Sequence, residues 1–217
     1  MDILERYVAI DNKCAWPNLT LMPDGSIIAA VFGEPCHLLW EGAAECWRSQ
    51  DGGRSWSFLS VPVPNDVGTN RGNLAAGLTP GGALVVLCAG RSNVCPKGVR
   101  PDPAAPVDSH VLAPVVARSE DGGTTWTHES QLFVPESSNV KPFGDIVRLP
   151  GGRLAASGYS ATDEYAVDES GDSAWIYFSD DDGRTWGDAG LIGDGYNETD
   201  LLVLGDGKLL AAGRTNR

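Results

Sequence analysis

The chain lacks three patterns that mark large functional classes. No apolar run approaches the roughly 20 residues that a membrane-spanning helix needs. Basic residues are scarce, 16 against 29 acidic ones, and the formal charge of -13 argues against nucleic acid and membrane surfaces as partners. The five cysteines are an odd number without Cys-x-x-Cys spacing, which predicts neither a disulfide framework nor a zinc site. We therefore expect no metal and no cofactor.

The first residues also lack the pattern of an export signal. Residues 1–6 contain no basic stretch that leads into an apolar core, so no secretory signal is visible. Together with the cysteine count, this predicts a reduced, cytoplasmic setting. The sequence carries no signal for an oligomeric state.

Glycine and proline are plentiful instead, with 27 and 14 copies, and they fall within repeats. The pattern Ser-x-Asp-x-Gly-x-(Ser/Thr)-Trp occurs at residues 49–56, 119–126 and 179–186, and such repetition indicates a repeat architecture. Its glycine frees a tight turn, its Asp and Ser/Thr side chains bond nearby amides, and its Trp buries apolar surface against the sheet. We interpret each copy, called a box below, as a structural staple and not as a catalytic element.

A second repeat consists of an apolar strand, a glycine-containing tight turn and another apolar strand. Its turn glycines are separated by 57, 70 and 55 residues, and they are Gly25, Gly82, Gly152 and Gly207. One unit is thus strand A, tight turn, strand B, variable loop, strand C, box and strand D. Four short antiparallel strands per unit predict the blade of an all-β propeller.

The units predict a single, partial propeller domain over residues 1–217. We expect blade 1 at about 14–63, blade 2 at about 70–135, blade 3 at about 141–193, and the start of blade 4 at about 197–217. An open arc of about three and a half blades leaves bare sheet edges. We therefore expect the chain to be the N-terminal part of a longer protein, with closure by oligomerisation as the alternative.

The blade pattern also predicts where function resides. Tight turns and boxes share one end of the sheets, whereas the long B–C loops and the starts of the A strands share the other, and long loops carry function more often. Polar side chains gather at this second end: Glu34, His37, Glu41, Arg71, Arg91, Asp145, Tyr159, Glu198 and Arg214. Arginine forks bind carboxylates and paired carboxyl groups act on glycosidic bonds, so this set suits an anionic sugar.

Over residues 14–217 the chain resembles the sialidase (neuraminidase) superfamily, whose Asp-boxes alternate with strand pairs in the same order. The resemblance implies a six-bladed β-propeller. It also implies a substrate carboxylate held by three arginines, an aspartic acid as acid/base, and a tyrosine nucleophile that a glutamate activates. Asp-boxes also occur in propellers that are not sialidases.

Two family residues match positions of this chain. The segment from Asn197 to Arg214 resembles the family's glutamate, turn, apolar strand and arginine, which implies that Glu198 activates the tyrosine and that Arg214 binds the carboxylate. At the family's first arginine this chain has Ala15, followed by Trp16 and Pro17. The family's third arginine and its tyrosine fall beyond the end of this chain.

The family's acid/base aspartate has no direct counterpart here. The first B–C loop holds His37, Glu41 and Glu45 instead, and we expect Glu41 to act as the acid, because partial burial of a carboxyl group raises its pKa. Arg71 or Lys13 is expected to compensate for the missing first arginine.

The resemblance favours an enzyme, an exo-α-sialidase-like glycoside hydrolase that cleaves next to an anionic sugar. The catalytic residues are predicted to be Glu198, Glu41 and His37. The predicted substrate-binding residues are Arg214, Arg71, Asp145 and Tyr159. Two alternatives stay open, namely a non-catalytic Asp-box propeller that binds glycan or protein, and a polysaccharide lyase on the same fold. The sugar, the linkage and the stereochemical outcome are not predicted.

Overall fold

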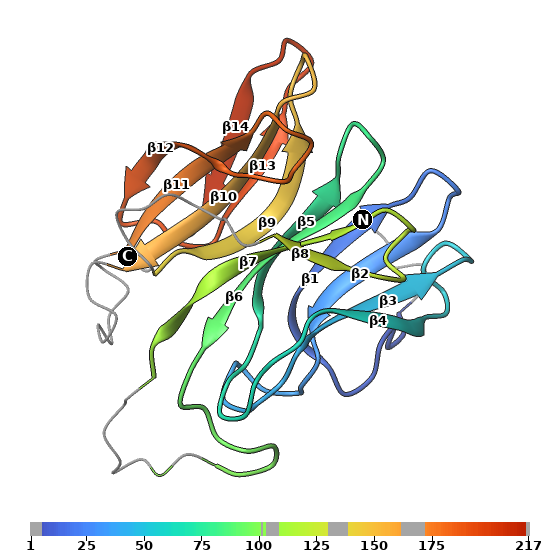
Figure 1. The fold of residues 1–217 in the computed structure, drawn as a ribbon, viewed down its shortest axis with the longest axis vertical. Helices are drawn as coiled ribbons and strands as arrows, with labels where there is room; N and C mark the ends of the chain where they lie inside the picture. The colour runs from blue at the N-terminus through green and yellow to red at the C-terminus, as the bar shows by residue number, and fades with distance from the viewer. Residues whose placement is uncertain (1–5, 101, 103–108, 130–138, 162–171, 216–217) are drawn as a thin grey trace.

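A computed structural model describes residues 6–100, 102, 109–129, 139–161 and 172–215 (Figure 1). Every helix or strand assigned in these residues is a β-strand. None of their segments forms a helix long and apolar enough to cross a membrane. The all-β class predicted from the repeats is therefore confirmed.

The first sheet is an antiparallel meander of four strands in chain order. Its strands are β1 (Cys14–Leu21), β2 (Ile27–Phe32), β3 (Ala44–Ser49) and β4 (Ser57–Val63). The β1–β2 turn is tight because Gly25 adopts a φ of 83° and the Ser26 amide donates to Asp24 Oδ1 at 3.0 Å. The first box connects β3 to β4.

The same order of strands returns twice more and then begins again. The second meander contains β5 (Asn73–Leu78), β6 (Leu84–Arg91), β7 (Val111–Ser119) and β8 (Thr127–Glu129). The third contains β9 (Lys141–Arg148), β10 (Leu154–Ala161), β11 (Asp172–Ser179) and β12 (Gly187–Asp194). A hairpin of β13 (Thr199–Val203) and β14 (Leu209–Gly213) follows.

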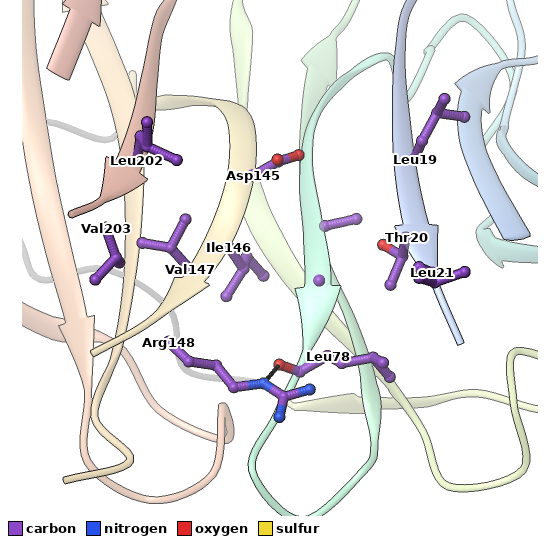
Figure 2. A pocket seen from close by; sticks show the side chains of 12 residues that line it. Leu19, Thr20, Leu21, Leu78, Asp145, Ile146, Val147, Arg148, Leu202 and Val203 are labelled. Atoms are coloured by element: carbon purple, nitrogen blue, oxygen red, sulfur yellow. Dashed lines mark hydrogen bonds between the residues drawn. The ribbon is translucent and has the colours of Figure 1, made fainter. Parts of the chain in front are cut away.

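The first strands of the meanders approach one another along one axis. Strands β5 and β9 pair in parallel through Ala75↔Gly144 and Ala76↔Asp145, which joins the second and third meanders into one eight-stranded sheet. Residues of β1, β5, β9 and β13 line a groove of about 380 Å³. Figure 2 shows the side chains around it. The sheets do not close into a ring within the described residues, so the six-bladed ring and the blade limits stay predictions.

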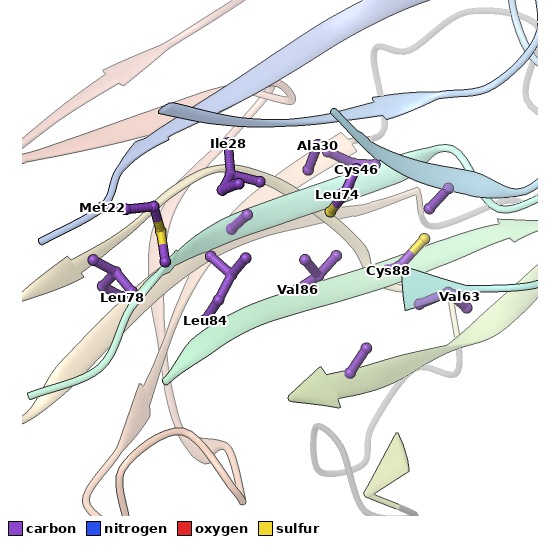
Figure 3. Packing of buried hydrophobic residues seen from close by; sticks show 13 residues of the cluster. Met22, Ile28, Ala30, Cys46, Val63, Leu74, Leu78, Leu84, Val86 and Cys88 are labelled. Carbon is purple, nitrogen blue, oxygen red and sulfur yellow. The ribbon is translucent and has the colours of Figure 1, made fainter. Parts of the chain in front are cut away.

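The core lies between neighbouring meanders, whose faces pack against each other. Ile28, Ala30 and Cys46 of the first meander meet Leu74 and Val86 of the second (Figure 3). A second cluster joins the second meander to the third and includes Val85, Leu87, Ile146, Leu154 and Trp186. Burial raises the pKa of the Cys46 and Cys88 thiols to about 12, so both act as small apolar side chains in this core.

Each box is stapled by the same hydrogen bonds. In the second box, Asp121 Oδ1 accepts from the Thr125 amide at 2.9 Å, and Ser119 Oγ accepts from the Gly123 amide at 2.8 Å. Asp51 and Asp181 accept equivalent bonds at 2.9 and 2.8 Å. The geometry agrees with the interpretation of the boxes as structural elements.

The box aspartates make stability depend on acid pH. The bonds from the Thr125 amide and hydroxyl lower the pKa of Asp121 to about 2. Its contribution is therefore complete above the unfolded-state pKa of about 3.9 and is lost as the pH falls through about 2. We expect Asp121→Asn to lower the unfolding temperature at neutral pH and the difference to vanish between about pH 4 and pH 2. Thermal unfolding across this range tests it, with the exposed Asp66→Asn as control; a difference that persists unchanged at pH 2 would contradict it.

Asn70 fixes the first long loop to the second meander. Its side chain is fully buried, its Nδ2 donates to Leu38 O at 2.9 Å and to Trp40 O at 3.3 Å, and its Oδ1 accepts from the Arg91 amide at 2.9 Å. Because both ends of the amide are used, the loop between β2 and β3 depends on this one side chain.

We expect Asn70→Ala to lower the free energy of unfolding by about 2–4 kcal/mol, because it leaves several buried backbone groups without partners at about 1–3 kcal/mol each. Denaturant unfolding measures this. Asn70→Asp retains the acceptor for Arg91 and loses both donors, so an aspartate variant as stable as the wild type would show that the loop does not depend on these bonds.

Candidate functional site

The candidate residues lie at the end of the sheets opposite the boxes, except Asp145, which lies in the middle of β9. This end holds the starts of β1, β5, β9 and β13 and the ends of the strands that pair with them. The tight turns lie at the other end of the same hairpins, as the Gly25 turn between β1 and β2 shows. Loops at the first end are long, so side chains there can converge without disturbing a tight turn.

Glu198 and Arg214 meet at the open end of the last hairpin. Arg214 Nη1 donates to Glu198 Oε2 at 2.7 Å. The backbone holds the pair in place, because the Asn197 amide donates to Arg214 O at 3.0 Å and the Arg214 amide donates to Glu198 O at 3.3 Å. Glu198 is 17% exposed and Arg214 49%, so the pair lies at the surface with its carboxylate the better protected. The sequence-predicted pair is thus in contact.

Glu41 and His37 lie on the loop between β2 and β3, in separate contacts. Glu41 Oε1 accepts from the Gly68 amide, and the Glu41 amide donates to Cys95 O at 2.8 Å. His37 is exposed and stands edge-to-face with Trp16, with ring centroids 4.8 Å apart. Trp16 has a φ of 52°, a backbone conformation that costs a bulky side chain energy.

Arg71 and Lys13 differ in the charges around them. Lys13 Nζ lies 3.0 Å from Glu45 Oε1 and donates to Gly33 O at 2.7 Å, so an acid already compensates it. Arg71 Nη1 donates to Ala113 O at 3.2 Å, but its Nε is buried and has no hydrogen-bond partner. In the described part of the chain, Arg71 forms no ion pair. Of the two, Arg71 is the cation still able to receive an anion.

Asp145 and Tyr159 both lie on the third meander. Tyr159 is buried at the end of β10, with Lys141 Nζ 4.5 Å from its ring centroid. Asp145 Oδ1 accepts from Asn18 Nδ2 at 2.8 Å, and the Asp145 amide donates to Asp200 Oδ1 at 2.9 Å. Desolvation of the carboxylate, followed by the negative charge of Asp200, raises the pKa of Asp145, although the bond from Asn18 opposes this.

Sequence reasoning missed Asn18 and Asp200, which surround Asp145. The signal for them is a constant distance from the tight turns. Counting back seven residues from Gly25, Gly152 and Gly207 gives Asn18, Asp145 and Asp200. The repeat therefore places the three side chains at equivalent points of β1, β9 and β13. Among the described residues, no group of three or more His, Cys, Asp or Glu side chains is arranged to hold a metal ion.

The sequence is similar to that of a curated sialidase from Micromonospora viridifaciens. The two are 28% identical over 239 aligned residues, and the match covers 97% of this chain but 35% of the relative. The chain thus spans about a third of the length of this relative. No known family model matches it.

The fold is similar to those of solved sialidases. A mutant of the NanB sialidase from Streptococcus pneumoniae aligns with a TM-score of 0.70 at 12% identity, covering 94% of this chain and 48% of that one. The Hadza microbial sialidase Hz136 aligns with a TM-score of 0.67 at 19% identity, covering 92% and 42%. The chain is thus similar to sialidases both in sequence and in fold.

Proposed function

We propose that the chain supplies the front part of the active site of a sialidase-like glycoside hydrolase built on a six-bladed propeller. The substrate is an anionic, sialic-acid-like sugar, and the bond cleaved is the glycosidic bond next to it. The single observation that carries the proposal is the contact between Glu198 and Arg214, at 2.7 Å. These are the two positions at which the chain matches the superfamily's glutamate and arginine.

Glu198 acts as a base in this proposal. Its carboxylate is largely protected from solvent, and the bond from Arg214 orients it. It accepts the proton of the tyrosine hydroxyl that the superfamily resemblance implies as nucleophile. Arg214 has five N–H donors, so its bond to Glu198 is compatible with a simultaneous bond to the carboxylate of the sugar.

Glu41 is the proposed acid/base group. The Gly68 amide holds its carboxyl group at the junction between the first long loop and the segment that enters β5. This position lies near the start of an inner strand, as does that of Glu198. His37 is proposed to assist from the same loop, where Trp16 fixes its ring.

Arg71 is the proposed replacement for the arginine that is absent at Ala15. A buried guanidinium nitrogen without a partner costs free energy, and a substrate carboxylate would supply the missing acceptor and the missing charge. Lys13 is less suited, because Glu45 already neutralises it. Asp145 and Tyr159 are proposed to contact the sugar from the third meander.

Removal of the proposed base tests the catalytic assignment. We expect Glu198→Gln to lower kcat by about 10²-fold to 10⁴-fold, the usual contribution of a positioned proton acceptor. The measurement is hydrolysis of a fluorogenic α-sialoside by the whole protein, and the control is Glu120→Gln in the second box, at the other end of the sheets. Wild-type activity in Glu198→Gln, with the fold intact by circular dichroism, would exclude Glu198 as the base.

Replacement of Arg71 tests separately whether this residue binds the carboxylate of the substrate. Charged hydrogen bonds contribute about 1.5–3 kcal/mol, so we expect Arg71→Ala to weaken binding of the anionic sugar about tenfold to a hundredfold. Titration calorimetry with a sialic acid and with a neutral sugar of the same size measures the effect, with the exposed Arg54→Ala as control. Equal losses for both sugars would show that Arg71 does not recognise the carboxylate.

A glycan-binding propeller without catalysis is the second candidate. Ala15 at the arginine position and the aromatic pair of the half-buried Trp16 and the exposed His37 favour it, because aromatic rings stack on a sugar without a carboxylate. The two candidates differ in turnover. A wild-type protein that binds the sialoside and does not hydrolyse it supports the binding module.

A further inference from the structure

Asp145 and Asp200 form a pair of carboxylates without a compensating cation. Asp200 Oδ1 accepts from the amides of Asp145 and Leu201, both at 2.9 Å, which holds it against β9. Gly144 has a φ of 78°, and a Cβ there would collide with Asp200 Oδ1, so the close approach requires glycine. In the described part of the chain neither carboxylate forms an ion pair.

The amide of Asn18 provides a second, independent observation. Asn18 is 5% exposed, and its Nδ2 donates to Gly144 O at 2.6 Å and to Asp145 Oδ1 at 2.8 Å. Because Nδ2 faces two acceptors, the orientation of the amide is determined, and Oδ1 is buried without a hydrogen-bond partner. A buried carbonyl oxygen without a donor is costly, and a cation satisfies it.

Both carboxylates are open to solvent. Asp145 and Asp200 are exposed, Asp145 lines the groove between the inner strands, and Figure 2 shows its carboxylate above mainly apolar side chains. Asn18, Asp145 and Asp200 occupy the same position of the repeat on β1, β9 and β13. The repeat therefore puts one oxygen-bearing residue at the same position of three inner strands.

We propose that Asn18, Asp145 and Asp200 form a binding site for a hard divalent cation, with Ca²⁺ preferred, that ties the three inner strands together. The donors are carboxylate and amide oxygens, which suit Ca²⁺ or Mg²⁺ and not a thiolate- or imidazole-seeking metal. The site is irregular and open on one side, and Ca²⁺ accepts such a geometry more readily than Mg²⁺ does. Neither the cysteine pattern nor the local spacing of acids predicts it, because its ligands lie on three separate repeats and one of them is an amide.

The role of this site is structural, and its test does not depend on hydrolysis. The probe is CaCl₂, added to the full chain after treatment with a chelator. We expect binding with a dissociation constant on the order of 10⁻⁴–10⁻³ M, the range of weak calcium modules, and an unfolding temperature that rises with the Ca²⁺ concentration. Calorimetry gives the first quantity and thermal unfolding the second.

Substitutions locate the ion. Asp145→Asn and Asp200→Asn each remove one charge at nearly constant shape, and we expect about tenfold weaker Ca²⁺ binding or more, whereas the exposed Asp66→Asn leaves it unchanged. Calcium binding that is unchanged in both Asp145→Asn and Asp200→Asn overturns the proposal. A wild-type chain whose unfolding temperature does not respond to Ca²⁺ overturns it as well.

A variant that strengthens the site keeps the proposal testable if Asp145→Asn and Asp200→Asn fail to fold. Asn18→Asp adds a third carboxylate, so we expect it to bind Ca²⁺ more tightly than the wild type and to depend on the ion for its stability. Calcium affinity in Asn18→Asp that does not exceed the wild-type value overturns the proposal.

Discussion

Face-to-face packing of neighbouring meanders is the constraint on which the rest of this structure depends. Strand β6 shows it most directly, because Leu84, Val86 and Cys88 pack toward the first meander while Val85 and Leu87 pack toward the third. A strand covered on both faces has no polar side, which explains the continuous apolar run in this part of the sequence. Each meander therefore depends on its neighbours to bury its apolar faces, and in β6 the polar side chain is at the end of the strand.

This packing explains where the candidate site lies. The box end is fixed by short hydrogen-bonded turns, such as the Asp121–Thr125 staple, which leave little freedom for a binding surface. The other end has long loops, and buried amides such as that of Asn70 hold them in place. Side chains from different meanders meet there because the inner strands β5 and β9 run in parallel and therefore begin at the same end.

The sequence predicts the strands of the fold because the same pattern of strands and turns recurs several times along the chain. It also singles out Glu198 and Arg214, and the register of their hairpin brings the two into contact in the structure. It does not predict that Lys13 is neutralised by Glu45, because that contact reaches from the start of β1 across β2 to β3. The bond from Asn18 to Asp145 is still less accessible, because it joins residues 127 positions apart through the arrangement of three meanders.

The second meander offers an internal comparison for the acidic groups on the axis. Counting back seven residues from Gly82 gives Ala75, a fully buried residue that pairs with Gly144 and packs in the apolar core. The fold therefore accommodates a small apolar side chain at this repeat position. Packing alone does not account for the exposed carboxylates of Asp145 and Asp200 at the same position, in a chain that already carries a formal charge of -13. The cation proposed above would balance the two charges.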